Sequence, residues 1–290
     1  MSNLILIGLI IILLIYQHLI NQLETFSSKN HIWMYWQDKP GTNKPNYLKL
    51  CYQTISKNKG NSQQLHLLDQ NSIYQYLPDL RTDLDQKCNI PQKADYIRLA
   101  LLQRYGGIWL DSDIIIFRPL DKLFLLLNEY DFIGFGCHFK DCHLRLSGYP
   151  RPANWVLGSP KNGKLVTYCL QQANNILSQQ PKLLTQKYHC LGRELLWTGI
   201  DFLRKNDQDW KYYHFNSQCF ERDYQGQKIT NQRLISNENI DQQCKNKMIF
   251  IPVYNTAPGF PTWFKNMTED QILEQNILFS RLIRYALTDK

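Results

Sequence analysis

Two aspartates separated by one serine are the residues in this sequence whose type and spacing most suggest chemistry. Asp111, Ser112 and Asp113 follow one apolar run and precede another. On an extended chain the two carboxylates point the same way and face a single ion. They repel each other unless a cation intervenes, and oxygen ligands of this kind suit Mn²⁺ or Mg²⁺. Such a cation can stabilise the charge that develops on a departing diphosphate.

The surrounding segments decide between this interpretation and a simple polar turn, which is the commoner meaning of an isolated Asp-x-Asp. Upstream, apolar residues recur at helical spacing over 94–105, and Gly106 and Gly107 then end the predicted helix. Asp95 and Arg98 lie at its start, three residues apart. As a surface ion pair they would contribute only a few tenths of a kcal/mol, roughly 0.2–0.5. A binding role is favoured by the glycines and acidic pair that follow.

The run from 93 to 113 resembles the core motif of DXD glycosyltransferases of the α-mannosyltransferase and large clostridial toxin type. It is most similar to capsular polysaccharide synthesis proteins, which share Asp-x-x-Arg, a helix, Gly-Gly-x-Trp/Tyr-x-Asp and a second acidic position. The resemblance implies a GT-A-type α/β domain and a hexosyltransferase-like activity, expected to retain the anomeric configuration. It assigns nucleotide-sugar binding to Asp95, Arg98, Gly107 and Asp111, and metal binding to Asp111 and Asp113. It assigns no catalytic residue.

An aromatic run at 32–37 is similar to the first strand of the same family, in which an aromatic side chain stacks on the nucleotide base. Trp36 occupies that position, and Trp33 is expected in the core. Stacking on an indole is favourable and tolerates different bases. The implied donor is a UDP- or GDP-sugar, and the implied acceptor is a glycan or glycoconjugate.

The resemblance weakens further along the chain. Asn154 either reaches the sugar or belongs to a strand with a capped turn, and Glu194 and Asp201 are better explained as helix surface charge than as sugar ligands. The loop 255–263 contains Pro and Gly and is a candidate lid that excludes water from the donor.

Two other functions fit parts of the pattern. An aspartyl phosphatase also needs an acidic strand end, with one carboxylate to attack and another to donate a proton. However, such enzymes lack the preceding Asp-x-x-Arg helix. A non-catalytic sugar-binding protein on the same fold is the second alternative, because a fold does not prove activity.

The elements that must position these residues alternate between strand and helix, which is typical of an α/β domain. We predict a mixed central sheet flanked by helices. Strands are expected at 32–36, 64–68, 108–110, 114–117, 131–135, 155–157 and 248–253, and helices at 47–56, 94–105, 163–177, 193–205 and 269–287.

The N-terminus differs in composition from the rest. It is apolar and uncharged from Leu4 to Tyr16, which is marginal for a bilayer span, and it lacks the basic start and the cleavage site of a signal peptide. We predict an uncleaved single-pass membrane anchor at 1–23, a linker at 24–30 and one domain at 31–290. The charges on either side do not orient the anchor.

Charge and cysteine content exclude other classes. The net charge is +8, but Lys and Arg are scattered, so we expect no nucleic-acid partner. Cys137, His138, Cys142 and His143 form one compact cluster without a second half, so a loop disulfide or free thiols are favoured over a zinc site.

Overall fold

The computed structural model describes residue 11 and residues 30–136, 151–215, 227–239, 249–253 and 260–288. The predicted membrane anchor at 1–23 and the cluster around Cys137 and His143 therefore lie outside the described residues, Ile11 apart. Within these ranges, no helix has both the length and the apolar character that a membrane span requires.

A mixed six-stranded sheet forms the centre of the molecule, as predicted. Its strand order is β2-β1-β3-β6-β5-β7. β6 is antiparallel to both neighbours, whereas the pairs β1–β2, β1–β3 and β5–β7 are parallel. The strands are β1 (Asn30–Tyr35), β2 (Gln63–Leu68), β3 (Gly107–Leu110), β5 (Phe132–Phe135), β6 (Ala153–Ser159) and β7 (Tyr212–Phe215).

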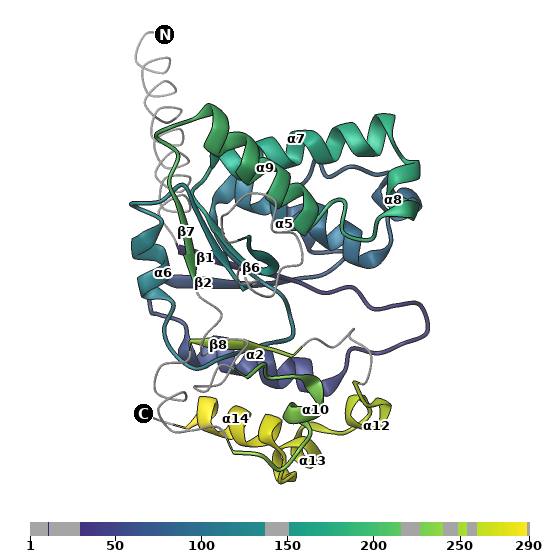
Figure 1. The fold of residues 1–290 in the computed structure, drawn as a ribbon. Coiled ribbons are helices and arrows are strands. Elements are labelled where there is room, and N and C mark those ends of the chain that lie inside the picture. The colour runs from purple at the N-terminus through teal and green to yellow at the C-terminus, as the bar shows by residue number, and fades with distance from the viewer. Residues whose placement is uncertain are drawn as a thin grey trace, which may run out of the picture.

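Helices cover one face of this sheet in a continuous layer (Figure 1). Within that layer α5 packs on α7, which packs on α9, and α5 also contacts β1, β3 and β6. The sequence of β1 is apolar throughout because the strand is buried on both faces. Trp33 packs toward these helices, and Ile32 and Met34 pack on the other side of the sheet. The helices of this half are α3 (Ile73–Tyr76), α4 (Leu84–Lys87), α5 (Ile90–Tyr105), α7 (Lys164–Gln179), α8 (Lys182–Gln186) and α9 (Arg193–Asn206).

The opposite face is covered by a second layer built around a two-stranded sheet, β4–β8 (Figure 1). Ile114 and Ile116 of β4 pack toward the central sheet, whereas Ile115 packs against α2 and α14. This layer joins residues near both ends of the sequence. Its elements are α2 (Asn46–Asn58), β4 (Ile114–Ile116), α6 (Asp121–Leu126), α10 (Asn231–Leu234), β8 (Phe250–Pro252), α12 (Thr262–Lys265), α13 (Glu269–Glu274) and α14 (Leu278–Leu287).

Three differences from the predicted elements have local causes. α5 begins four residues early, because Asn89 and Gln92 form a capping box ahead of it. The helix predicted at 269–287 is wrong in its middle, where Gln275 and Ile277 adopt extended backbone and divide it into α13 and α14. β7 was not predicted, and its four residues are all only half-buried, so its alternation signal is weak.

Candidate functional site

The candidate site lies where the carboxyl ends of β1 and β3 meet the start of β6. Because β1 and β3 are parallel, Trp36 and Asp111, which follow them, lie at the same edge of the sheet. β6 runs the other way, and the amide of Asp111 donates a hydrogen bond to the carbonyl of Trp155 over 2.9 Å. This edge is where open α/β sheets usually bind ligands. The topology thus gathers three segments that are far apart in the sequence.

Arg98 joins two carboxylates that come from different elements. Its Nη2 lies 3.1 Å from Oδ1 of Asp95 on the same helix and 3.1 Å from Oδ1 of Asp111 beyond β3. The side chains of Arg98 and Asp95 are only 5% and 7% exposed. The predicted i,i+3 pair therefore exists, but the surface interpretation of it is wrong, since the pair is buried and includes Asp111.

Polar contacts from β3 and β6 fix this cluster. The indole of Trp109 donates to Oδ1 of Asp111 over 2.7 Å and lies 4.9 Å from the guanidinium of Arg98. The amide of Asn154 donates to Oδ1 of Asp95 over 2.8 Å, and its backbone carbonyl accepts a hydrogen bond from Arg98. Each carboxylate thus accepts a neutral hydrogen bond in addition to the shared ion pair.

Burial shifts the protonation of both carboxyl groups. Loss of solvation raises the pKa of Asp95 to about 6, with the attraction of Arg98 opposing the rise. The pKa of Asp111 is also raised by burial, again against the effect of Arg98. The anionic forms are therefore less stable here than in water, and an added positive charge favours them. A divalent cation beside Asp111 would supply such a charge.

The Asp-Ser-Asp segment is a turn, which corrects the extended geometry assumed for it. It links β3 of the central sheet to β4 of the small sheet. The Ser112 hydroxyl donates to the carbonyl of Tyr35 over 3.0 Å, and the amide of Val253 donates to the carbonyl of Asp113 over 2.8 Å. The position of the acidic pair at a strand end is confirmed. However, the two aspartates lie in a turn, so the rule that alternate residues of a strand share a face does not apply to them.

The donor set at this turn fits a hard divalent cation. Both contacts of Asp111 described above use Oδ1, and its side chain is 31% exposed, so the other oxygen is available to a ligand. Across the described ranges, His, Cys, Asp and Glu side chains form no metal-binding group of three or more. Mg²⁺ and Mn²⁺ beside phosphates are commonly held by one or two protein carboxylates, with substrate and water oxygens completing the shell.

Trp36 lies at the same edge of the sheet and is half-buried. Its amide donates to the carbonyl of Leu68, and its indole donates to Oδ1 of Asp38 over 2.7 Å. By contrast, Trp33 is fully buried and donates to the carbonyl of Gly106 over 2.8 Å. Trp33 is therefore a core residue, as predicted, while Trp36 has a partly accessible face beside the site.

Two glycines are required by close packing, and only one of them is at the site. Gly107 begins β3, at the opposite end from Asp111, where a Cβ atom would lie 2.3 Å from the carbonyl oxygen of His31. Its φ of +102° is a second reason for glycine. Gly192, just before α9, packs against Asp95, whose Oδ2 would lie 2.4 Å from an added Cβ. The structure thus places Gly107 away from the other predicted binding residues.

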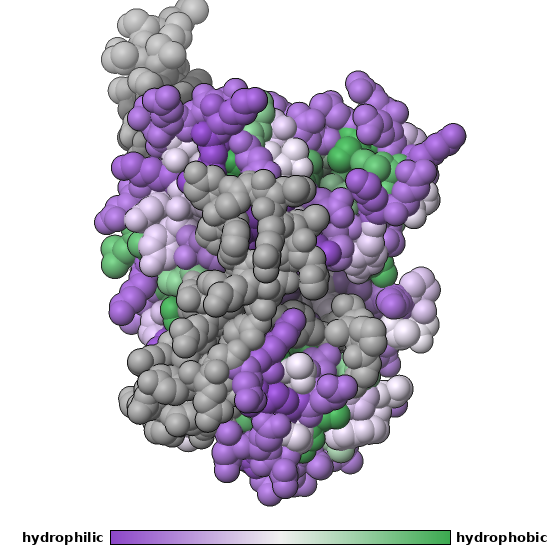
Figure 2. Space-filling model, in the orientation of Figure 1, coloured by the Kyte–Doolittle hydropathy of each residue, from purple (hydrophilic) through white to green (hydrophobic). Residues whose placement is uncertain are grey.

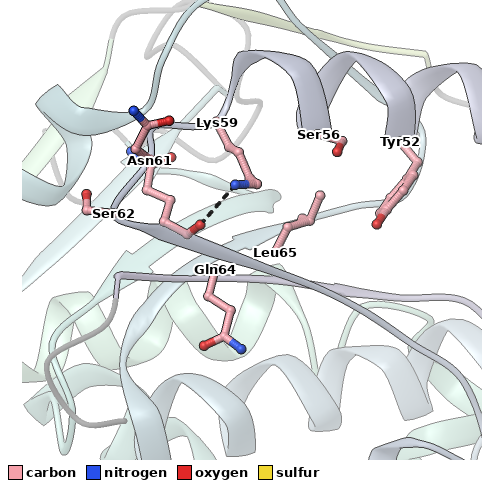
Figure 3. A pocket seen from close by; sticks show the side chains of 8 residues that line it. Tyr52, Ser56, Lys59, Asn61, Ser62, Gln64 and Leu65 are labelled. Atoms are coloured by element: carbon pink, nitrogen blue, oxygen red, sulfur yellow. Dashed lines mark hydrogen bonds between the residues drawn. The ribbon is translucent and has the colours of Figure 1, made fainter. Parts of the chain in front are cut away.

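The remaining candidates are dispersed. Asp201 pairs with Arg151 over 2.5 Å, and residues 255–259 of the predicted lid at 255–263 fall outside the described residues. A polar hollow between the end of α2 and the start of β2 lies at the other end of the strands (Figure 3). There Lys59 donates to the backbone of Gln63, and Gln64 projects to the other side of β2. This hollow is separate from the candidate site.

Sequence reasoning missed the roles of Trp109 and Gly192 and left Asn154 undecided. Trp109 is part of the recognised motif, and its spacing of two residues from Asp111 on a strand indicates that they share a face. Gly192 and Asn154 gave no such local signal. They reach Asp95 only because β6 and α9 pack beside α5, which is a long-range feature.

Comparison with known proteins finds one curated relative and several solved structures similar to this chain. Glycosyltransferase afumC of Aspergillus fumigatus is 30% identical over 111 residues, which are 34% of this chain and 28% of that protein. This chain therefore matches little more than a quarter of the length of that relative. Among solved structures, the galactosyltransferase LgtC with donor and acceptor sugar analogues gives a TM-score of 0.47 at 13% identity, covering 90% of this chain and 97% of that one. The glycosyltransferase GlyE of Streptococcus pneumoniae TIGR4 gives 0.45 at 16% identity, covering 90% and 61%.

All three of these proteins are glycosyltransferases by name. A family model described as "Capsular polysaccharide synthesis protein" matches residues 13–221, which include every element of the candidate site from β1 to α9. The chain therefore belongs to the capsular polysaccharide synthesis protein family.

Proposed function

We propose that this protein is a metal-dependent glycosyltransferase that transfers a sugar from a UDP- or GDP-sugar to a hydroxyl group of a glycan or glycoconjugate. The observation that carries the proposal is the buried Asp95–Arg98–Asp111 cluster at the carboxyl ends of the strands. A simple structural ion pair does not need a second carboxylate that remains 31% exposed. The cluster presents anionic and cationic groups together at the edge where a nucleotide sugar is expected to bind.

In this proposal, different side chains at this edge bind the base, the diphosphate and the sugar of the donor. Trp36 offers an indole face to the base, and Asp111 and Asp113 hold Mn²⁺ or Mg²⁺ against the diphosphate. When bound, the cation neutralises the charge that develops on the leaving diphosphate. Asp95 accepts hydrogen bonds from sugar hydroxyls, and Arg98 holds Asp95 and Asp111 in fixed positions.

The proposal is tested by incubating the protein with a panel of UDP- and GDP-sugars and Mn²⁺ and measuring release of the nucleoside diphosphate. Asp113→Ala should lower metal-dependent release by about 100-fold or more, as expected for loss of a group that stabilises transition-state charge. Asp209→Ala is the matched control, because Asp209 is an exposed carboxylate just before β7, at the opposite edge of the sheet from Asp111, and its loss should leave the rate unchanged. An unaffected rate in Asp113→Ala would contradict the metal assignment.

The same assay separates the alternatives. Phosphate release from monoesters would favour the aspartyl phosphatase, and donor binding without turnover would favour a sugar-binding protein. Retention is checked by NMR of the anomeric proton in the first product formed. The membrane attachment predicted for 1–23 is part of the proposal and is tested by carbonate extraction of membranes.

A further inference from the structure

A second charged group lies beside the candidate site, on the first turns of α9. Trp197 is 5% exposed, and its indole donates to the carbonyl of Pro152 over 2.7 Å, so the ring is held firmly. Two guanidinium groups lie over this ring, from Arg151 at 5.4 Å and from Arg193 at 5.5 Å. The ring therefore holds two cations at defined positions.

These two cations differ in how they are neutralised. Arg151 forms an ion pair with Asp201 over 2.5 Å. The side chain of Arg193 forms no hydrogen bond or ion pair with any residue in the described part of the chain, and its Nε atom is buried without a partner. Glu194 follows it in the sequence but does not lie within ion-pair distance of it. A partly buried guanidinium in this state is more stable once an anion reaches it.

The segment that leads into α9 connects Arg193 to the donor site. Gly192 packs directly on Asp95. Tyr188 is 51% exposed. Its pKa is raised by burial of part of the ring and, to a lesser extent, by the negative charges of Asp95 and Asp111. Its ring contacts that of His189 with centroids 4.7 Å apart, and the charge of Arg193 in turn helps to lower the pKa of His189. A continuous strip thus runs from the carboxylates to Arg193.

With the donor placed as proposed above, the sugar lies at Asp95 and the diphosphate at Asp111 and Asp113, so this strip leads from Arg193 to the sugar end of the donor. Asp113 lies toward the lower layer, where Val253 after β8 bonds to its carbonyl, whereas α9 belongs to the opposite layer (Figure 1). Asp95 connects the two regions. Gly192, just before α9, packs on Asp95, and Asp95 and Asp111 both form an ion pair with Arg98. On the same placement, a group bound at Arg193 lies beyond the donor sugar, on the side away from the diphosphate.

We propose that Arg193 is the anion-binding residue of the acceptor subsite, and that the acceptor carries a carboxylate or phosphate group, as a hexuronide or sugar phosphate does. This rests on the glycosyltransferase function proposed above. Trp197 keeps the guanidinium in place, and the exposed ring of Tyr188 offers an apolar face to the acceptor sugar beside it. A planar guanidinium binds either oxyanion in a bidentate manner.

The test compares matched acceptors with the best donor found in the panel: methyl hexosides, the corresponding methyl hexuronides, and hexose 6-phosphates. In the wild-type protein one acidic class should exceed the neutral hexoside in kcat/KM by about tenfold or more, and Arg193→Gln should reduce that ratio to near one. The class that wins identifies carboxylate or phosphate as the ligand. Arg193→Lys should keep part of the preference, because it retains charge without the fork.

Lys205→Gln removes one exposed positive charge from the same helix and should keep the full preference, which excludes a general electrostatic effect. Equal use of neutral and acidic acceptors by the wild-type protein would overturn the inference, as would an Arg193→Gln variant that raises the donor KM equally with every acceptor. If no donor supports turnover, the proposed function fails, and calorimetric titration with the hexuronides, the hexose phosphates and inorganic phosphate decides the anion site alone. Binding that Arg193→Gln removes supports it, and equal or absent binding in both proteins refutes it.

Discussion

Replacing Arg98 by methionine should cost about 3–5 kcal/mol of unfolding free energy, the usual effect of removing one partner from a buried ion pair. The estimate follows from its surroundings, since the Arg98 side chain is 5% exposed, contacts Asp95 and Asp111 at 3.1 Å each, and packs over Trp109. A surface i,i+3 pair would lose only about 0.5 kcal/mol. Donor binding should weaken as well, because both carboxylates lose the group that positions them.

The loss of stability in Arg98→Met should also depend on pH, and the direction of that dependence is a second test of this prediction. Without Arg98 the pKa of Asp95 should rise above its present value of about 6, since the opposing attraction disappears. A carboxyl group whose folded pKa is raised stabilises the fold at low pH and loses that effect as the pH rises through the folded pKa. The variant should therefore be closest to the wild type near pH 5 and furthest from it near pH 8.

Urea unfolding followed by tryptophan fluorescence, with EDTA present, measures both quantities. Arg104→Met is the matched control, because Arg104 lies on the same helix and its ion pair with Asp79 is exposed, so the loss should stay below about 1 kcal/mol. Adding Asp95→Asn to Arg98→Met should recover part of the stability by removing the uncompensated charge. Equal losses in the two arginine variants, or a penalty for Arg98→Met that does not grow with pH, would refute this account of the cluster.

Three further results are expected. Asp95→Asn should flatten the stability profile between pH 3 and pH 8 by about 3 kcal/mol, because the wild-type pKa rises from 3.8 to about 6 and each unit corresponds to about 1.36 kcal/mol; an unchanged urea profile would count against the raised pKa. Gly107→Ala should cost more than about 2 kcal/mol by thermal unfolding, since its Cβ would meet the His31 carbonyl, while a changed donor KM with normal stability would restore the binding role predicted for it. Trp36→Ala should raise the donor KM about tenfold and Trp36→Phe much less; equal KM values for both would argue against stacking.

The sequence predicted most elements of the central sheet because their periodicity is local. β1, α2, β2, α5 and β3 follow one another with clear changes from alternating to helical spacing. The junction of β3 with Asp111 was also correct, since a glycine pair, a short apolar strand and two aspartates can be read directly from the chain. The helix across 269–287 was wrong because α13 and α14 share one apolar face, and two extended residues between them leave that pattern nearly unchanged.

The sequence singled out Asp95, Arg98 and Asp111, which the structure brings together, but it missed Trp109 and Gly192, included the distant Gly107, and did not give the geometry of the cluster. Spacing alone indicated that Asp95 and Arg98 lie one helical turn apart, but not that both are buried or that Arg98 also reaches Asp111. That contact depends on the pairing of β3 with β6, and the register of antiparallel strands separated by more than forty residues leaves no local trace. The placement of Gly192 against Asp95 has the same origin.

The small sheet β4–β8 has a practical consequence for protein production. The family model ends at residue 221, yet β8 pairs with β4 beyond that point and the amide of Val253 donates to the carbonyl of Asp113. A shortened protein that ends at the family boundary keeps Asp95, Asp111 and Asp113 but loses the hydrogen bond from Val253 to the backbone carbonyl of Asp113. It also exposes the apolar surfaces of α2 and β4. Expression vectors for crystallography or assay should therefore extend through α14, even though that tail contains no recognised motif.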